Sequence, residues 1–393
     1  MALTLCLAGN EPRQQYLFAE LARQSRVLAE LAFDDIDPVT KVVAALLSYA
    51  RPRSEWWGNY QMHPLVQRRR RRVLQRGLRR VTPRPDALLT WGSWFNPASD
   101  VPFFTYIDQS RSLAPLPGER PASRQRGERA HAMQAKTYQD AGAVFCMSQW
   151  ARAQTLEAHD VPPDKVLAVG WGPCAVDLSA EAIPDAAREP LVLHVSNDFR
   201  RKGVDYLLAT AERVAAVDPT IRFVVIGRDG SGLPVADTKN VTFTGPIYDR
   251  AQLADYFRRA SLFFLPHRFD RSPHVLVEAM SAGLPLVTSA QGGASELVDG
   301  TGIGAAVAVG DVDGYAGAIL HLMRDADARR TASIRARALM MERYNWPVIA
   351  SRILERISRS RDVLDDVRAQ CGGERHGQVL PEARAPGVCA VVR

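Results

Sequence analysis

The sequence predicts an α/β protein with two domains of similar size, each built around a parallel sheet. Three observations support this expectation. The chain has 393 residues, which is enough for two domains at about 100–200 residues each. From residue 190 onward, short β-branched runs alternate with stretches of helical periodicity, and the first half follows the same order less regularly. A polar loop punctuated by prolines, 175–190, separates the two halves.

The second half reads as consecutive strand and helix units. We expect strands at 191–196, 222–226, 241–244, 262–265 and 285–288, and helices at 204–217, 274–282, 295–298 and 312–323. Several strands end at a glycine, a proline or a polar residue, as at Gly227 and Gly245. In open α/β sheets, ligands bind outside this end of the strands.

The first half and the C-terminal segment complete the expected organisation. Strands are predicted at 3–7, 87–90, 103–107 and 143–147, and helices near 14–30 and 122–141. Helical pattern resumes over 329–360 and is broken at Asn345-Trp346-Pro347, where the proline suits the first turn of a new helix. We therefore predict an N-terminal domain over 1–180, a C-terminal domain over 186–343, a separate helix over 344–362 and a flexible tail over 367–393.

The positive charge is concentrated in one segment. The formal net charge is +7, from 50 basic and 43 acidic residues. Residues 67–84 contain nine arginines and no acid, and without them the formal charge becomes −2. The segment fits a helix, and its arginines include Arg68, Arg69, Arg70, Arg71, Arg72, Arg76, Arg79 and Arg80.

This arginine segment has several interpretations. A basic amphipathic helix attracts anionic lipid head groups, so these arginines are candidates for docking on a membrane surface. They equally suit an anionic acceptor such as a lipid-linked saccharide, and a solvated helix is the plain alternative. Nucleic acid is disfavoured, because neither stacking aromatics nor a recognised binding module accompanies the arginines.

The remaining composition favours a reducing compartment. The five cysteines are odd in number, widely spaced and without a C-x-x-C pair, which indicates neither a disulfide framework nor a zinc site. The N-terminus lacks the basic region of a signal peptide. No apolar run reaches the 18–20 or so residues that span a bilayer, and the longest, near 42–50, has about half that length. We expect a cytoplasmic protein, peripheral on the inner face of the membrane if the arginines bind lipid.

Two acids stand out beside an expected helix start. Asp270 lies at the exit of the 262–265 strand, and Glu278 lies eight residues later, inside the next helix. A loop that leads into a helix N-terminus offers N–H groups and the positive end of the helix dipole to a pyrophosphate. Nearby carboxylates can accept hydrogen bonds from sugar and ribose hydroxyls. The spacing alone is equally consistent with a solvated surface. The surrounding residues must therefore distinguish a binding site from such a surface.

The surrounding residues resemble the nucleotide-sugar-dependent retaining glycosyltransferases of family 4. In that family an acid and seven further residues precede Glu-Ala-Met, and a small residue with Gly-x-Pro and then Gly-Gly-x-x-Glu follow. Here the motif reads Asp270, Glu278-Ala279-Met280, Ala282-Gly283-Leu284-Pro285 and Gly292-Gly293-Ala294-Ser295-Glu296. The resemblance covers about 143–357.

This resemblance implies a fold and a reaction. The fold is GT-B, in which two Rossmann-like domains face each other across a cleft and a C-terminal helix crosses back to the N-terminal domain. The reaction is transfer of a glycosyl group from a nucleoside-diphosphate sugar to a hydroxyl acceptor, with retention of anomeric configuration. The acceptor is a saccharide, a lipid-linked glycan or a small molecule.

A second block of residues resembles the part of the family that binds the donor diphosphate. Within 194–205, Lys202 stands just before the helix that Gly203 opens. Lys202 supplies a point charge to phosphate, and Arg200 or Arg201 adds a planar fork. The segments 225–230 and 241–246 resemble those that pack around the base, which the backbone near Gly245 would contact.

Three departures from the family bear on the site. The first acid is usually Glu, and Asp270 is one methylene shorter. The arginine often found five residues before the loop lysine is Asn197 here, which shifts phosphate contacts to Arg200 or Arg201. The histidine frequent in the N-terminal domain has no clear counterpart, and Asp108, at the exit of the 103–107 strand, is the candidate on the acceptor side.

The resemblance therefore implies a catalytic set and a donor-binding set. The catalytic set is Lys202, Asp270 and Asp108. The donor-binding set is Arg200, Arg201, Lys202, Gly245, Asp270, Pro273, His274, Glu278, Gly293 and Glu296. No obligatory cofactor or metal is implied.

Two metal-like patterns have plainer explanations. Asp311-Val312-Asp313 mimics a D-x-D metal motif but opens a helix after Gly310, so N-capping explains it better. His267 is expected to line the cleft or pack at a strand end. Two rival functions stay open: a different reaction on the same scaffold, such as a nucleotide-sugar epimerase or a phosphorylase, and a non-catalytic binding protein whose arginines dock on a membrane or polyanion.

Overall fold

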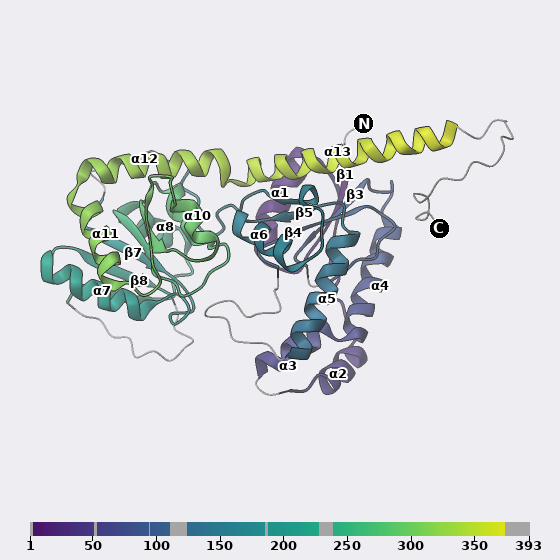
Figure 1. Ribbon diagram of the computed structural model, residues 1–393, viewed down its shortest axis with the longest axis horizontal. Helices are drawn as coiled ribbons and strands as arrows, with labels where there is room; N and C mark the ends of the chain where they lie inside the picture. The colour runs from purple at the N-terminus through teal and green to yellow at the C-terminus, as the bar shows by residue number, and fades with distance from the viewer. Residues whose placement is uncertain are drawn as a thin grey trace.

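Two six-stranded parallel sheets organise the chain. The computed structural model describes residues 3–50, 53–93, 95–110, 124–184, 188–227 and 239–373 (Figure 1). The first sheet has the order β2 (Arg26–Leu31), β1 (Thr4–Ala8), β3 (Ala87–Trp91), β4 (Phe103–Ile107), β5 (Val144–Cys146) and β6 (Val166–Ala168). The second has the order β12 (Gly304–Val307), β11 (Leu286–Ser289), β10 (Leu262–Leu265), β7 (Leu191–Val195), β8 (Arg222–Ile226) and β9 (Val241–Gly245).

Helices accompany both sheets. The first domain contains α1 (Gln14–Gln24), α2 (Pro38–Leu47), α3 (Arg53–Met62), α4 (Pro64–Arg80), α5 (Arg124–Asp140) and α6 (Gln149–Ala158). The second contains α7 (Val204–Val217), α8 (Arg250–Arg259), α9 (His274–Ser281), α10 (Ser295–Val298), α11 (Val312–Arg324) and α12 (Ala326–Arg343), and α13 (Trp346–Gly373) follows. These layers confirm the expected fold class, two Rossmann-like α/β domains.

The strand order of the second sheet locates its ligand-binding edge. Counted within the domain, β9-β8-β7-β10-β11-β12 is the order 3-2-1-4-5-6 of a doubly wound fold. The direction of winding reverses between β7 and β10, and the crevice outside the carboxyl ends of these two strands is where such sheets bind ligands. The loops that leave β7 and β10 are therefore the place to look for a site.

Most predicted elements are confirmed within one or two residues, and the differences have simple causes. The helix predicted over 14–30 is wrong beyond Gln24, because Ser25 is extended and β2 then pairs with β1 at the sheet edge. The elements α2, α3, α6, α8, β6 and β12 were not predicted. The final helix continues to Gly373, which corrects the tail expected from 367, and residues 374–393 lie outside the described part of the chain.

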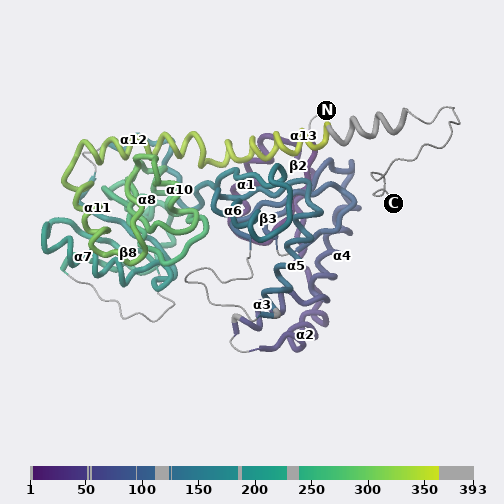
Figure 2. The backbone as a smooth tube through the Cα atoms, viewed as in Figure 1, coloured from purple at the N-terminus to yellow at the C-terminus, as the bar shows by residue number. Residues whose placement is uncertain are grey.

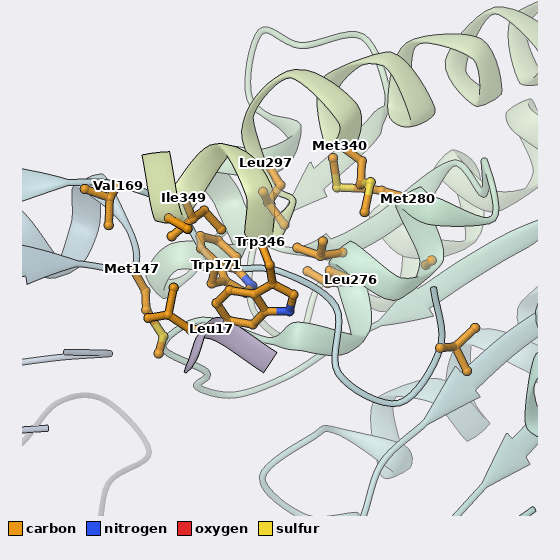
Figure 3. Packing of buried hydrophobic residues seen from close by; sticks show 14 of the residues in the cluster. Leu17, Met147, Val169, Trp171, Leu276, Met280, Leu297, Met340, Trp346 and Ile349 are labelled. Atoms are coloured by element: carbon orange, nitrogen blue, oxygen red, sulfur yellow. The ribbon is translucent and has the colours of Figure 1, made fainter. Parts of the chain in front are cut away.

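One hydrophobic cluster joins the two domains (Figure 3). Its members include Leu17, Met147, Val169 and Trp171 from the first domain and its exit, Leu276, Met280, Leu297 and Met340 from the second, and Trp346 and Ile349 from α13. The indole Nε1 of Trp346 donates to the carbonyl of Pro173 at 2.7 Å. A Cβ on Gly172 would lie 2.6 Å from the Trp346 ring, so the linker needs glycine to pass this close.

The last helix returns to the first domain. Figure 2 shows α12 along one domain and α13 along the other. Gln24 at the end of α1 donates to the carbonyl of Pro347 at 2.9 Å, and Ser351 donates to Gln24 Oε1 at 2.8 Å. The expected crossing helix is thereby confirmed, and the first domain is assembled from both ends of the described chain.

Polar contacts join the carboxyl edges of the two sheets. The backbone N–H of Trp150 donates to Glu296 Oε2 at 3.2 Å. Arg271, which follows β10, pairs with Asp108, which follows β4, at 3.5 Å. These contacts bring the loops after β4 and β5 against the loops after β10 and β11.

The interdomain carboxyl group of Glu296 gives a testable pH dependence. Burial raises the pKa of Glu296 to about 7, although hydrogen bonds from the N–H groups of Trp150 and Gln149 oppose the shift. Since the folded state holds the proton more tightly, the stability contributed by this group is fully present below about pH 4 and is lost as pH rises through about 7. We expect Glu296→Gln to gain stability relative to wild type between about pH 5 and about pH 8, by about 2 kcal/mol.

Urea unfolding at both pH values measures this gain. Glu342→Gln, which changes an exposed acid on α12, is the control and should follow the wild-type profile. Parallel profiles for Glu296→Gln and wild type would contradict the prediction.

Candidate functional site

Two loops touch at the switch point between β7 and β10. The loop after β7 ends at Gly203, whose φ is +73°, and α7 follows directly. A Cβ at this position would lie 1.8 Å from the carbonyl oxygen of Pro266, in the loop after β10. Glycine is therefore required on two counts, the backbone conformation and the close approach. The contact brings Lys202 beside the loop that carries Asp270.

Lys202 and Asp270 form a buried ion pair at this point. The Nζ of Lys202 donates to Asp270 Oδ2, and Lys202 is almost fully buried. Arg201 Nη1 reaches the same oxygen at 3.3 Å. The other oxygen, Oδ1, accepts from the backbone N–H of Arg271 at 2.8 Å. Two of the three residues predicted to be catalytic, Lys202 and Asp270, are thus in direct contact, although 68 positions separate them.

The charges around Asp270 favour its ionised form. Burial by itself raises the pKa of Asp270, but the charges of Lys202 and Arg201 outweigh burial and hold that pKa well below its ordinary value. A carboxylate has about four acceptor positions, of which these contacts use three. An ammonium group has three N–H donors, of which Asp270 uses one. The pair can still bind an anion through Lys202 and a hydroxyl through Asp270.

The two neighbouring arginines differ in their surroundings. Arg201 is held within the loops, since its Nε donates to Asp198 Oδ2 at 3.1 Å and its Nη1 also reaches the carbonyl of Phe269 at 3.3 Å. Arg200 has an exposed side chain, and its carbonyl accepts from Arg268 at 2.8 Å. Arg201 therefore adds to the local positive charge from a fixed position.

A pair of glycines supports the loop that carries the acid. Gly292 has a φ of +65°, and a Cβ there would lie 2.0 Å from the carbonyl oxygen of Asp270. The N–H of Gly293 donates to the carbonyl of Arg271 at 2.9 Å, and a Cβ on Gly293 would lie 2.2 Å from that oxygen. Both glycines lie against the backbone of the acid loop and hold it in place.

The helix α9 binds the linker between the domains. Glu278 Oε1 accepts from the N–H groups of Cys174 at 3.1 Å and Ala175 at 2.8 Å. Ser281 Oγ accepts from the N–H of Leu178 at 3.0 Å. Burial raises the pKa of Glu278, while these backbone donors and the charge of Lys202 oppose the rise. One face of α9 thus holds the chain segment that leads out of the first domain.

His274 belongs to the same linker contact. Its Nδ1 lies 2.7 Å from the carbonyl oxygen of Gly172 and 3.3 Å from the Cys174 sulfur. Because a carbonyl oxygen only accepts, Nδ1 carries the proton. Burial, joined by the charge of Arg13, lowers the pKa of His274 to about 4, so the ring is neutral near pH 7. Pro273 precedes it as the N-cap residue of α9.

The remaining predicted residues lie around the ion pair without contacting it. Gly245 ends β9, two strands from β7 on the same edge of the sheet, with a φ of +72°. Asp108 faces Arg271 from the first domain, and Glu296 binds the N–H of Trp150. The segment 228–230, expected near the base, lies outside the described residues.

The arginines of α4 divide into two groups. Arg68, Arg72, Arg76, Arg79 and Arg80 are exposed. Arg70 is not, which corrects its predicted docking role: it is 4% exposed, and its Nε donates to Asp34 Oδ1 at 2.5 Å. Arg69 pairs with Asp37 at 3.4 Å, and Arg71 reaches the carbonyl of Asn96 at 3.4 Å. Helical spacing explains the division, since Arg70 shares the inward face with Val66 and Leu74.

Sequence reasoning did not assign a role to Arg13, Arg271 or Cys174. Arg13 follows β1 and is close enough to act on the pKa values of His274 and Cys174 through its charge. Its position after the first strand was the available signal, since carboxyl ends of parallel strands form the ligand edge. The partners of Arg271 and Cys174 lie a hundred or more residues away, and no local pattern indicates them.

The positions of Asp311 and His267 agree with the plainer explanations of their patterns. Asp311 Oδ1 accepts from the N–H of Gly314 at 2.9 Å and caps α11. His267 is fully buried, with both ring nitrogens near backbone carbonyl oxygens of Leu265 and Gln291. Within the described ranges, no group of three or more His, Cys, Asp or Glu side chains is placed to hold a metal ion. Within those ranges too, every helix is too short or too polar to cross a membrane.

Comparison with known sequences identifies the second domain. Residues 189–325 match the family model described as "Glycosyl transferases group 1". Phosphatidyl-myo-inositol mannosyltransferase of Mycolicibacterium smegmatis is 30% identical over 162 residues, which cover 40% of this chain and 42% of that protein. D-inositol 3-phosphate glycosyltransferase 2 of Catenulispora acidiphila is 30% identical over 204 residues, covering 47% and 45%. The chain thus spans less than half the length of these curated relatives.

Solved structures resemble almost the whole chain. Sucrose-phosphate synthase of Thermosynechococcus elongatus superposes with a TM-score of 0.64 at 18% identity, covering 94% of this chain and 100% of that one. Anabaena HepE in complex with UDP superposes with a TM-score of 0.62 at 17% identity, covering 91% and 100%. At this identity the likeness establishes the fold. Residues 189–325 are thus similar to the glycosyl transferases of group 1, and the two facing domains with the returning helix α13 form a GT-B fold.

Proposed function

We propose that this protein transfers a sugar from a nucleoside-diphosphate sugar to a hydroxyl acceptor, with retention of anomeric configuration. One observation carries the proposal: the buried Lys202 and Asp270 meet at the switch point of the domain that matches the group 1 model. The names of the relatives, a mannosyltransferase and an inositol-phosphate glycosyltransferase, support it. So does the UDP bound to a neighbour of the same fold.

In this proposal, Lys202 stabilises the leaving diphosphate. Negative charge grows on the phosphate oxygens as the bond to the sugar breaks, and fixed donors aimed at that charge lower the barrier. The ion pair with Asp270 holds the Lys202 side chain in one place, so little rearrangement is needed. Arg201 and the exposed Arg200 add positive charge, and the N-terminus of α9, which Pro273 precedes, supplies a fixed dipole.

The carboxylates accept hydrogen bonds from the hydroxyl groups of the donor. Asp270 orients the sugar through its remaining acceptor position. Glu278 binds the ribose in addition to the two backbone N–H groups of the linker that its Oε1 accepts. The backbone near Gly245 receives the base. His274, Gly293 and Glu296 hold the surrounding loops and the linker in position.

Asp108 is the proposed residue on the acceptor side of the reaction. It follows β4 in the first domain and meets Arg271 of the acid loop, so it stands where an acceptor hydroxyl would approach the donor. The acceptor class is a saccharide, a lipid-linked glycan or a small molecule. The nucleoside-diphosphate sugar is the donor substrate, and no cofactor is obligatory. The free thiols of Cys6, Cys146 and Cys174 favour a cytoplasmic location.

Replacement of Lys202 tests the catalytic role. We expect Lys202→Met to lower donor turnover by at least about 100-fold, as loss of one electrostatic contact to the transition state does. The same change leaves the buried Asp270 with Arg201 alone and should lower the free energy of unfolding by about 3 kcal/mol. Release of nucleoside diphosphate measures the first effect, and urea unfolding measures the second.

A double variant separates the two effects. Lys202→Met/Asp270→Asn removes both charges, so it should regain most of the stability while its turnover stays low. Lys136→Met, at an exposed lysine of α5, is the control and should change neither property. Wild-type turnover in the double variant would remove Lys202 and Asp270 from the proposed mechanism.

Nucleotide binding tests the donor class. A ligand that binds the native state at 100 times its Kd stabilises it by about 2.7 kcal/mol, so the matching diphosphate among UDP, GDP and ADP should raise Tm by several degrees. The thermal shift should fall strongly in Lys202→Met at the same ligand concentration. If none of the three diphosphates or their sugars shifts Tm, the proposed donor site is wrong.

Product analysis tests the reaction itself. Incubation with the matching donor, with and without acceptor, distinguishes transfer from epimerisation of the donor. NMR of the new glycosidic linkage reports whether the anomeric configuration is retained. A product of inverted configuration contradicts the proposed stereochemistry while leaving the donor site in place.

A further inference from the structure

The helix α2 turns an apolar stripe toward solvent. Val39, Leu46 and Leu47 are 72%, 72% and 68% exposed, and Val42 and Val43 lie beside them. Their spacing of three and four residues places all five on one face of the helix. Soluble proteins rarely expose large apolar side chains in contiguous groups, and such groups mark interaction surfaces.

The orientation of this stripe is fixed by contacts on the other side of α2. Asp37 caps the helix, its Oδ1 accepting from the N–H of Thr40 at 2.9 Å. Ala44 is fully buried in a small cluster with Ile36, Tyr60 and Val66. The indole of Trp56 donates to the carbonyl of Ala45 at 2.7 Å. The helix therefore cannot bury its stripe by rolling over without losing these contacts.

Exposed arginines lie on the helix that α2 contacts. Arg68, Arg72, Arg76 and Arg79 repeat at intervals of four, four and three residues, so they share the outward face of α4. The ion pair of Arg69 with Asp37 fixes the start of α2 against the first turns of α4, next to Arg68. Leu65 on α4 and Trp57 on α3, a helix that contacts both α2 and α4, are also exposed, at 40% and 61%.

We propose that this surface docks on an anionic lipid bilayer, with the α2 stripe in the boundary between head groups and acyl chains and the arginines on lipid phosphates. The docking surface consists of Val39, Val42, Val43, Leu46, Leu47, Trp57, Leu65, Arg68, Arg72, Arg76 and Arg79. Figure 1 shows α2 and α3 at the end of the first domain that lies farthest from its strands. The inference does not depend on the proposed sugar transfer.

A bilayer fits this surface better than the other occupants. It offers an apolar layer and a layer of phosphate side by side, which matches aliphatic and tryptophan side chains next to arginines. A second copy of the chain, packed through the same surface, would set the arginines of one copy against those of the other. Nucleic acid would match the arginines and leave the aliphatic stripe unused.

Vesicle co-sedimentation of the full chain tests the docking surface. The vesicles are pure phosphatidylcholine or an equimolar mixture with phosphatidylglycerol. We expect binding to the anionic vesicles that weakens as salt is raised, because arginine and lipid phosphate attract electrostatically. Leu46→Gln/Leu47→Gln should lower the partition coefficient at least about 10-fold, and Arg72→Gln/Arg76→Gln about 30-fold.

Matched variants on α12 serve as controls. Ile334→Gln/Met341→Gln removes two exposed apolar side chains, and Arg330→Gln/Arg335→Gln removes two exposed arginines. Both should bind vesicles like the wild type, and all four double variants should keep the wild-type Tm. In addition, Trp57 fluorescence should shift to the blue with anionic vesicles, and Trp57→Phe should lose that part of the signal.

Three outcomes would overturn the proposal. The first is no binding to anionic vesicles by the wild type. The second is equal loss of binding in the α2 variant and its α12 control. The third is a lipid-free dimer in analytical ultracentrifugation that Leu46→Gln/Leu47→Gln dissociates, since the stripe would then be covered by a second copy.

Discussion

The packing of Trp346 against the interdomain linker is the contact on which the arrangement of the two sheets depends. The chain leaves the first domain past Gly172 and returns to it at Trp346, and the indole packs on that glycine and donates to the carbonyl of Pro173. Side chains from both domains surround this point in one buried cluster. Both crossings of the chain are thus held in one hydrophobic contact, and the relative placement of the two carboxyl edges follows from it.

The helix α9 connects this packing to the chemistry. Leu276 and Met280 belong to the shared cluster, Glu278 and His274 bind the linker, and the helix N-terminus follows the loop of Asp270. A buried ion pair such as Lys202 with Asp270 adds little to stability, because removing both charges from water offsets their attraction. The pair instead holds the Lys202 side chain in a fixed position beside a helix terminus. An ion pair that contributes little to stability is therefore located where an anion is expected to bind.

The sequence predicted the second domain well and the first domain only in outline. Strands such as 262–265 end at a proline or glycine and are followed by strongly periodic helices, so their limits were visible. The strand β12, Gly304-Ala-Ala-Val, and the three-residue β6 have small or few side chains and form only because a neighbouring strand pairs with them. The helix α2 was seen only as part of an apolar run and carried no sign of which face would be exposed.

The residues of the site that belong to a sequence motif could be predicted. The contacts that the fold makes between distant residues could not. The family pattern indicated Lys202, Asp270 and the two glycines together. In contrast, the linker contacts of Glu278 and His274 join residues about one hundred positions apart, and Arg70 looks in sequence like its exposed neighbours. Such long-range contacts depend on how α9 and α4 rotate about their own axes, which local spacing cannot fix.

The return of α13 to α1 makes the first domain discontinuous in sequence. Its sheet comes from residues up to Ala168, yet Gln24 of α1 is bonded to Pro347 and Ser351 beyond the second domain. A chimera that exchanges the first domain for that of a related GT-B protein must therefore carry α13 with it, joining the chains at two places, near Gly172 and near Trp346. With a single junction in the linker, α1 of the related protein would pack against α13 of this protein. The exchanged domain would then lack the α13 with which it normally packs.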